Sequence, residues 1–307
     1  MIQHPILRVT RSELVQTFWE PTLQACFGSA TCSSKPDCTS TFQKGALVAP
    51  FFVSWGMVCH FEWNGLALQA DLTRPIDLST VLVGNGGPNP SAWYVDAPRM
   101  TPVVGEGFVG AVDQGGAVNF RDVLFNPHGH GTHTECMGHI TPVVHPVDPL
   151  FRNQTNHLPC LATTVTPKAM EEDLVVDADQ LDALPNAPWP PALVVRTLPN
   201  GEDKKTRAWS NTNPPYFTVA FMTKLVEQGV KHLLVDLPSV DREVDGGRLE
   251  AHHAFWGLPD NPRDRCSITE LIYMPSSAPD GMYLLHLGVA PMDNDAAISR
   301  PVLYPLI

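Results

Sequence analysis

The segment YFTVAFMTKLVEQGVKHLLVDL, residues 216–237, decides the fold class. Its first part carries apolar residues at helical spacing, and Gly229 suits the end of a helix. The run KHLLVDL (231–237) is typical of a buried strand, and PALVVRTL (191–198) upstream is another. A strand, a helix and a strand of these lengths predict a parallel βαβ unit with a right-handed crossover. The helical positions are Phe217, Phe221, Leu225 and Val226.

Strand patterns extend on both sides of this unit. Upstream, LALQADLTRPIDLSTVLV (66–83) indicates one or two strands around a polar turn, GNGGPNPSAW (84–93) a long loop, and GAVNFRDVLF (116–125) a strand. Downstream, the chain closes with three more strand-like runs, SITELIYM, GMYLLHLGVA and RPVLYPL. We therefore predict a mixed α/β class, richer in strand than in helix, in one domain over residues 63–307.

Residues 1–62 differ from this pattern, and we expect them to form an N-terminal extension. The stretch ALVAPFFVSWGMVCHF (46–61) is shorter than the roughly 20 residues of a membrane span and is broken by Pro50 and Gly56. We interpret it as buried strand or loop and expect no membrane partner, with membrane attachment as the alternative for this stretch. A small metal knuckle is an alternative for three cysteines spaced six apart in a loop-like stretch, Cys26, Cys32 and Cys38.

The composition restricts the classes of partner. The net charge of −12 argues against a nucleic-acid partner, because a phosphate backbone needs a cationic surface. The chain has 7 cysteines, an odd number, and no C-x-x-C pair, which argues against a disulfide framework. No signal-peptide pattern is visible, so we expect a reducing, cytoplasmic setting and a small-molecule partner.

The segment NPHGHGTHTECMGHI, residues 126–140, concentrates the groups that can carry chemistry. Gly129 and Gly131 argue against a helix and allow a sharp turn. Beyond them, side chains at every second position would share one face of an extended chain, at His133, Glu135, Met137 and His139.

This spacing favours a metal site. In an extended chain His133 and Glu135 lie roughly 7 Å apart at Cα, and His128 or His130 could fold back as a further ligand. His139 would lie roughly 13 Å from Glu135, which suits a proton-transfer residue better than a ligand of the same ion. Imidazole and carboxylate together suit Zn²⁺ or Mn²⁺. Such an ion acidifies a water molecule, so the pattern predicts hydrolysis of a carbonyl compound.

Two other interpretations of this segment stay open. It could be a solvated polar turn, or Cys136 could be a nucleophile with a histidine base, although its parity directs it away from His133 and Glu135. Further candidates lie downstream, at Asp236, His252, His253 and Glu270. Asp236 follows a predicted strand, where α/β sheets tend to place ligands, but it could equally form a buried ion pair with Arg196.

These residues resemble a known family. GTHTECMGH (131–139) is similar to the signature H-x-G-T-H-x-D-x-P-x-H of the metal-dependent cyclase-like hydrolases, which include the bacterial kynurenine formamidases (arylformamidases). ADLTRPIDLS (70–79) looks like the family's opening strand. LLVDLPSVD, AHHAFW and ITELI look like its second half. The resemblance covers about residues 63–307.

The resemblance implies a swivelling β/β/α fold, a dimer, and one or two divalent ions, zinc or manganese. It places metal ligands on His133, Glu135, His252 and Glu270, and the acid/base role on His139. The first signature histidine falls on Gly129, so His128 becomes the replacement ligand and His130 the alternative. Glu135 stands where the signature has Asp, and Met137 where it has Pro.

We therefore expect a metal-dependent hydrolase of an amide, formamide or cyclic amide, with N-formylkynurenine as one candidate substrate. Metal-activated water would be the nucleophile, and His139 would protonate the leaving nitrogen. The alternative is a non-catalytic binding protein of the same fold that uses the metal for stability.

Overall fold

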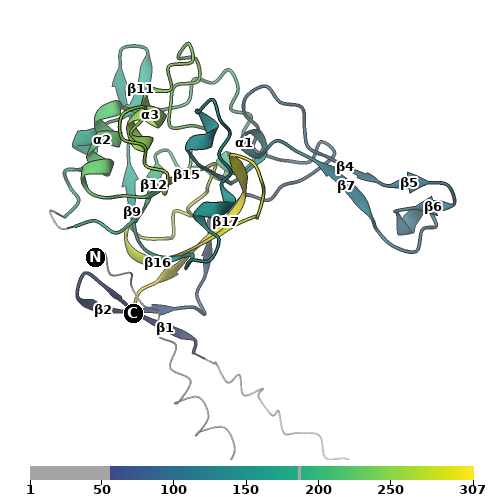
Figure 1. The fold of residues 1–307 in the computed structure, drawn as a ribbon, viewed down its shortest axis with the longest axis horizontal. Helices are drawn as coiled ribbons and strands as arrows, with labels where there is room; N and C mark the ends of the chain where they lie inside the picture. The colour runs from purple at the N-terminus through teal and green to yellow at the C-terminus, as the bar shows by residue number, and fades with distance from the viewer. Residues whose placement is uncertain (1–55, 186–187) are drawn as a thin grey trace, which may run out of the picture.

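The computed structural model describes residues 56–185 and 188–307, and the three cysteines of the possible knuckle lie outside this part. Seven strands form a closed, barrel-like sheet in the order β16-β9-β12-β14-β15-β8-β17, because β17 also pairs with β16 (Figure 1). A short strand, β3 (Ile76–Asp77), adds to β17. The seven strands are β8 (His133–Glu135), β9 (His157–Val165), β12 (Ala192–Thr197), β14 (His232–Val235), β15 (Ser267–Glu270), β16 (Gly281–Val289) and β17 (Ala296–Pro305). The predicted strand-rich, single-domain α/β fold is confirmed.

The predicted βαβ unit is present. Helix α2 (Val219–Glu227) connects β12 to β14, which pair in parallel with Ala192 opposite His232. Gly229 follows the helix with a φ of 79°, as its position after the last apolar residue predicted. The helix begins later than the apolar spacing indicated, because the Thr218 side chain caps it by accepting from Phe221 N. Phe217 instead ends a short strand, β13 (Tyr216–Phe217).

The sheet is apolar on both faces, as alternation along β14 shows. Leu233 and Val235 face a core cluster that contains the buried side chains of α2 and of α3 (Glu250–Trp256). Leu234, between them, belongs to a second cluster formed by residues from opposite walls of the sheet, including Leu285, and this cluster fills the barrel. Burial on both sides explains why the parallel strands read as continuous apolar runs.

Smaller elements surround the barrel. A hairpin joins β1 (Val58–Trp63) to β2 (Leu66–Asp71), so the expected boundary at residue 62 falls inside a strand. In Figure 1 an arm projects from the body, built by β4 (Arg99–Pro102), β5 (Val104–Gly105), β6 (Phe108–Val109) and β7 (Arg121–Leu124). The remaining strands are β10 (Lys168–Met170) and β11 (Asp173–Val176). The short 3-10 turns are η1 (Val112–Gln114), η2 (Met137–His139), η3 (Asp148–Leu150), η4 (Ala178–Leu181) and η5 (Glu202–Lys205).

Asp236 is buried at the end of β14, but Arg196 is not its partner. Lys204 Nζ lies 2.8 Å from Asp236 Oδ2, and Thr197 N and Oγ1 also donate to this carboxylate. Arg196 pairs instead with Asp280 Oδ1 at 2.9 Å. The alternative of an ion pair between Asp236 and Arg196 is therefore wrong. The cation that pairs with Asp236 is Lys204, which η5 brings next to the end of β14. Asp236 belongs to a structural ion pair.

In the described part of the chain, no helix has the length and apolarity needed to cross a bilayer.

His232 makes folding sensitive to acid. Burial, and to a lesser extent the charges of Lys231 and Arg263, lowers its pKa from the ordinary value of 6.5 to about 4. Between pH 6.5 and about 4 the unfolded chain binds a proton that the folded chain refuses, so the unfolding free energy falls, by about 3 kcal/mol over the whole window. We expect His232→Gln to flatten this part of the pH–stability curve in chemical unfolding. The exposed His60→Gln should leave it unchanged; equal slopes in all three proteins would contradict the assignment.

Candidate metal centre

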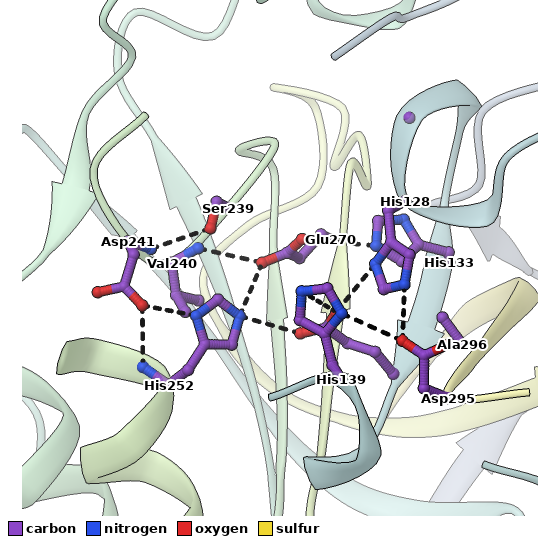
Figure 2. A network of polar contacts seen from close by, with 12 residues as sticks. His128, His133, His139, Ser239, Val240, Asp241, His252, Glu270, Asp295 and Ala296 are labelled. Carbon is purple, nitrogen blue, oxygen red and sulfur yellow. Dashed lines mark hydrogen bonds and ion pairs between the residues drawn. The ribbon is translucent and has the colours of Figure 1, made fainter. Parts of the chain in front are cut away.

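Strand β8 carries two of the predicted ligands into the centre of the sheet. It lies between β15 and β17, with Glu135 opposite Ile268 and Ala296, and His133 opposite Glu270. The side chains of His133 and Glu135 are fully buried, and His133 Nε2 lies 3.4 Å from Glu270 Oε2. Sheet pairing therefore brings together residues 133 and 270, which are far apart in the sequence (Figure 2).

The histidines before β8 are arranged by a single helical turn, α1 (Pro127–His130). The expectation that the glycines exclude a helix is wrong, because Pro127 starts the turn and the Asn126 side chain caps it by accepting from Gly129 N. A Cβ on Gly129 would lie 2.5 Å from Val95 Cγ2, so close packing excludes a side chain there.

This turn separates His128 from His130. His128 Nδ1 lies 3.1 Å from Glu135 Oε2. His130 accepts from Asn126 N at Nδ1 and donates from Nε2 to the Asp96 carbonyl, so both of its ring nitrogens are used. The structure thus brings His128 into the cluster and leaves the alternative, His130, outside it.

His139 lies closer to Glu135 than an extended chain allows. The chain leaves β8 and forms the 3-10 turn η2, which brings His139 Nε2 to 3.8 Å from Glu135 Oε2. The chain is therefore not extended between Glu135 and His139, as the separation of roughly 13 Å at Cα had assumed. The tight turn requires Gly138, since a Cβ there would lie 2.1 Å from the His145 carbonyl oxygen. His139 is also the most exposed of the four clustered histidines, at 31%.

Helix α3 supplies His252. Its Nε2 lies 3.1 Å from Glu135 Oε1 and 3.9 Å from Glu270 Oε1. The alternative, His253, is the next residue on the helix and is half-buried, with a side chain directed about 100° away. The structure brings His252 into the cluster.

Two carboxylates that the sequence analysis did not single out complete the site. Asp241 accepts from the backbone N–H groups of Ala251 and His252, and from His252 Nδ1 at 2.6 Å. Asp295 Oδ2 accepts from His128 Nε2 at 2.9 Å and from His139 Nδ1 at 3.1 Å. Asp295 lies 156 residues beyond His139 and no local pattern marks it, so only the pairing of β17 with β8 reveals it.

The four rings share one arrangement, which Figure 2 shows. Each has one nitrogen bonded on the outer side of the cluster, and for His133 this is Nδ1, which donates to the Gly131 carbonyl. The other nitrogen of each ring faces Glu135 or Glu270. Metal-binding histidines commonly have this arrangement, with the outer N–H held by a carboxylate or carbonyl.

Opposite charges dominate the electrostatics. Burial alone would lower the pKa of His128 and of His252, but the hydrogen bonds that these rings donate to carboxylates raise both to about 10. Glu135 is buried, which alone would raise its pKa, yet the imidazoles of His139, His128 and His252 hold it well below its usual range. Imidazoles therefore surround the buried carboxylate of Glu135 and stabilise its negative charge.

The residues fit a divalent ion. His133 Nε2 and Glu135 Oε2 are buried and lack a hydrogen bond of good geometry, an uncommon situation for native side chains. Their closest polar contacts are ion pairs, at 3.4 Å to Glu270 Oε2 and at 3.1 Å to His128 Nδ1. Two groups each offer three ligand atoms within 4.8 Å of one another, and Glu135 belongs to both. One is His128, Glu135 and His139, and the other is His133, Glu135 and Glu270. Nitrogen and carboxylate oxygen are the donors that zinc and manganese accept.

Cys136 does not fit the nucleophile alternative. Its Sγ donates to the His145 carbonyl at 3.1 Å, on the far side of the strand from Glu135. Burial raises the pKa of its thiol to about 11, whereas a nucleophilic cysteine needs a lowered one.

Residues 70–242, more than half of the sequence, match the family model described as "Putative cyclase". The chain belongs to this cyclase family. The matched span contains β8 and α1, whereas His252 and Glu270 of the cluster lie beyond it. Among curated proteins, none matches the sequence significantly.

Solved structures share the fold of this cyclase-family chain. One is a potential metal-dependent hydrolase with cyclase activity, with a TM-score of 0.55 at 14% identity over 75% of this chain and 97% of the other. A second, a predicted metal-dependent hydrolase from Bacillus stearothermophilus, gives 0.54 at 14% identity over 75% and 98%. A third, an isatin hydrolase bound to the product analogue thioisatinate, gives 0.53 at 13% identity over 76% and 92%. At these identities the similarity concerns the fold.

Proposed function

We propose that the protein is a metal-dependent hydrolase that cleaves the C–N bond of an amide, formamide or cyclic amide. The observation that carries the proposal is a pair of buried atoms without a well-formed hydrogen bond, His133 Nε2 and Glu135 Oε2, among imidazoles whose inner nitrogens face carboxylates. The proposed ligands are His128, His133, Glu135, His252 and Glu270. The structural similarity to an isatin hydrolase supports a cyclic amide as one substrate class.

The chemistry divides between the ion and the side chains. A divalent ion bound here supplies a Lewis acid and an acidified water at neutral pH. The buried glutamates and histidines would hold the ion in place, and their burial limits the access of bulk water to it. His139 lies at the exposed edge of the cluster, and Asp295 accepts from its Nδ1, so that Nε2 is left to hold or transfer a proton. We assign to this atom the protonation of the leaving nitrogen.

The charges of the cluster bear on the number of ions. Four carboxylates lie in or against it, those of Glu135, Asp241, Glu270 and Asp295. With neutral imidazoles they carry four negative charges, which two divalent ions would neutralise. We propose zinc or manganese, as one ion or as two that would share Glu135. His139 stays outside the proposed ligand set, although its ring nitrogen belongs to one of the two groups of close ligand atoms.

We also propose a homodimer. The arm formed by β4 to β7 projects from the body in Figure 1 and exposes several large apolar side chains, which a second copy could cover. These are Val104, Phe108, Val112, Val118, Phe120, Val123 and Leu124. A cytoplasmic, reducing setting is proposed as well, since the four cysteines of the described residues are free.

The decisive experiment combines metal analysis with a substrate panel. The purified protein, stripped and reloaded with zinc or manganese, is assayed on isatin, a formanilide and N-formylkynurenine. We expect bound metal and turnover that a chelator abolishes and metal restores. Bound metal that stabilises the fold, with no turnover of any compound, would favour the metal-stabilised binding protein. Absence of metal binding would refute both.

His139→Ala separates catalysis from metal holding. We expect kcat to fall about 10²- to 10⁴-fold, the range for loss of a general acid or base. The thermal midpoint should stay close to wild type, because this side chain is the most exposed of the clustered histidines. His145→Ala, an exposed histidine nearby, is the matched control and should keep full activity. Unchanged kcat in His139→Ala would exclude the assigned proton transfer.

A further inference from the structure

The position of Asp295 is fixed by the sheet rather than by the histidines that it contacts. β17 runs antiparallel to β8 with Ala296 opposite Glu135, so Asp295 comes just before the paired segment. Cys136 N donates to the Asp295 carbonyl at 3.0 Å. The side chain of Asn294 donates to the Ala296 carbonyl at 2.9 Å. The backbone on both sides of Asp295 is therefore held, and its carboxylate has a defined place above the cluster.

A single oxygen of this carboxylate serves two rings. Oδ2 accepts from His128 Nε2 and from His139 Nδ1. The two rings stack, with centroids 4.2 Å apart and planes inclined by 27°. The shared oxygen thus sets the orientation of both imidazoles at once (Figure 2).

This contact determines which nitrogen of each ring is free. An ionised carboxylate only accepts hydrogen bonds, so the ring nitrogens that face it must carry protons. Neutral His128 is then protonated at Nε2 and neutral His139 at Nδ1. The inner nitrogens, His128 Nδ1 and His139 Nε2, lie 3.1 Å and 3.8 Å from Glu135 Oε2. They are the nitrogens that would give up a proton to an ion held by Glu135, since the outer ones stay bonded to Asp295.

We propose that Asp295 is a positioning residue that fixes opposite tautomers in His128 and His139, so that both free nitrogens face Glu135 and its metal. The inference rests on the proposed function for its catalytic consequence, but not for its effect on metal binding. Asp241 provides the corresponding contact for His252 alone.

The test compares Asp295→Asn with Asp293→Asn. Both remove one negative charge from the same loop, but Asp293 is exposed and lies outside the cluster. Zinc affinity is measured by titrating metal-free protein against a chromophoric chelator. We expect Asp295→Asn to weaken it about 10- to 100-fold, the usual effect of losing such an outer partner, and Asp293→Asn to change it less than about 2-fold. Thermal unfolding verifies that both variants fold.

A spectroscopic measurement identifies the tautomers directly. In zinc-loaded protein, long-range ¹H–¹⁵N spectra of the imidazoles report which nitrogen of each ring carries the proton. Wild type should show His128 protonated at Nε2 and His139 at Nδ1, and Asp295→Asn should lose this pattern. In turnover assays the variant should lower kcat far more than it raises KM, and Asp295→Glu should recover part of both affinity and kcat.

The outcomes separate the two proposals. Wild-type tautomers and wild-type zinc affinity in Asp295→Asn would overturn the positioning role. If affinity and tautomers change as expected while the wild type hydrolyses nothing, Asp295 positions ligands of a metal centre that is not the proposed hydrolase.

Discussion

Replacing Glu135 with glutamine is expected to abolish both metal retention and hydrolysis. Glu135 belongs to both groups of ligand atoms, and its side chain is fully buried. Glutamine keeps the shape but removes the charge that attracts a cation, so neither group can hold an ion firmly. Loss of an ion that supplies several kcal/mol of transition-state stabilisation corresponds to a fall in kcat/KM of about 10³-fold or more.

The measurement is metal content after dialysis, together with kcat/KM on whichever amide the wild type cleaves. Glu227→Gln, on the exposed side of α2, is the matched control and should resemble wild type. Glu135→Asp introduces the residue of the family signature and keeps the charge, so it should retain metal. Full metal content in Glu135→Gln would show that the ion does not bind at this cluster.

Lys204→Met is expected to lower the free energy of unfolding strongly, although Lys204 is not one of the residues proposed to bind metal. Lys204 and Asp236 have side chains only 3% and 0% exposed, and methionine would leave Asp236 as an uncompensated buried charge. Removing one partner of such a pair costs about 3–5 kcal/mol of unfolding free energy. The neighbouring Lys205→Met, whose partner Glu202 is exposed, should cost less than about 1 kcal/mol.

Acid should reduce the deficit of Lys204→Met. Burial raises the pKa of Asp236, and Lys204 is the main group opposing that shift. Without Lys204 the folded-state pKa lies further above the unfolded value. The variant therefore recovers stability as the pH falls and the carboxyl becomes protonated. Chemical unfolding between pH 4 and 8 tests this, and a deficit that does not depend on pH would point to lost packing instead.

The parts of the fold that could be predicted are those coded by local patterns. The apolar run 231–237 predicted β14, because a strand buried on both faces is apolar at every position. The helical spacing before it predicted α2, because a helix buried on one face has apolar residues every three or four positions. The start of α2 was misplaced, since the capping side chain of Thr218 outweighs the apolar spacing that included Phe217.

The candidate site divides in the same way. The segment 126–140 contains its own ligand types, so His133, Glu135 and His139 could be proposed from residue chemistry. The choice of His128 over His130, and of His252 and Glu270 among the downstream candidates, came from the family resemblance. Distances could not be predicted, because a period of two cannot anticipate the 3-10 turn that brings His139 back toward Glu135. Asp295 reaches the site only through strand pairing, which no local pattern encodes.

If the proposed centre holds two ions, Glu135, the carboxylate common to both ligand groups, links their sites thermodynamically. The first ion to bind would fix the orientation of this side chain and replace protons held around it. The second would then meet a carboxylate already placed but already partly neutralised. These two effects have opposite signs, and their balance sets a coupling free energy that must be the same in either order of loading. Unless the two effects cancel, occupancy at one position would change the affinity at the other by the same factor in either order of loading.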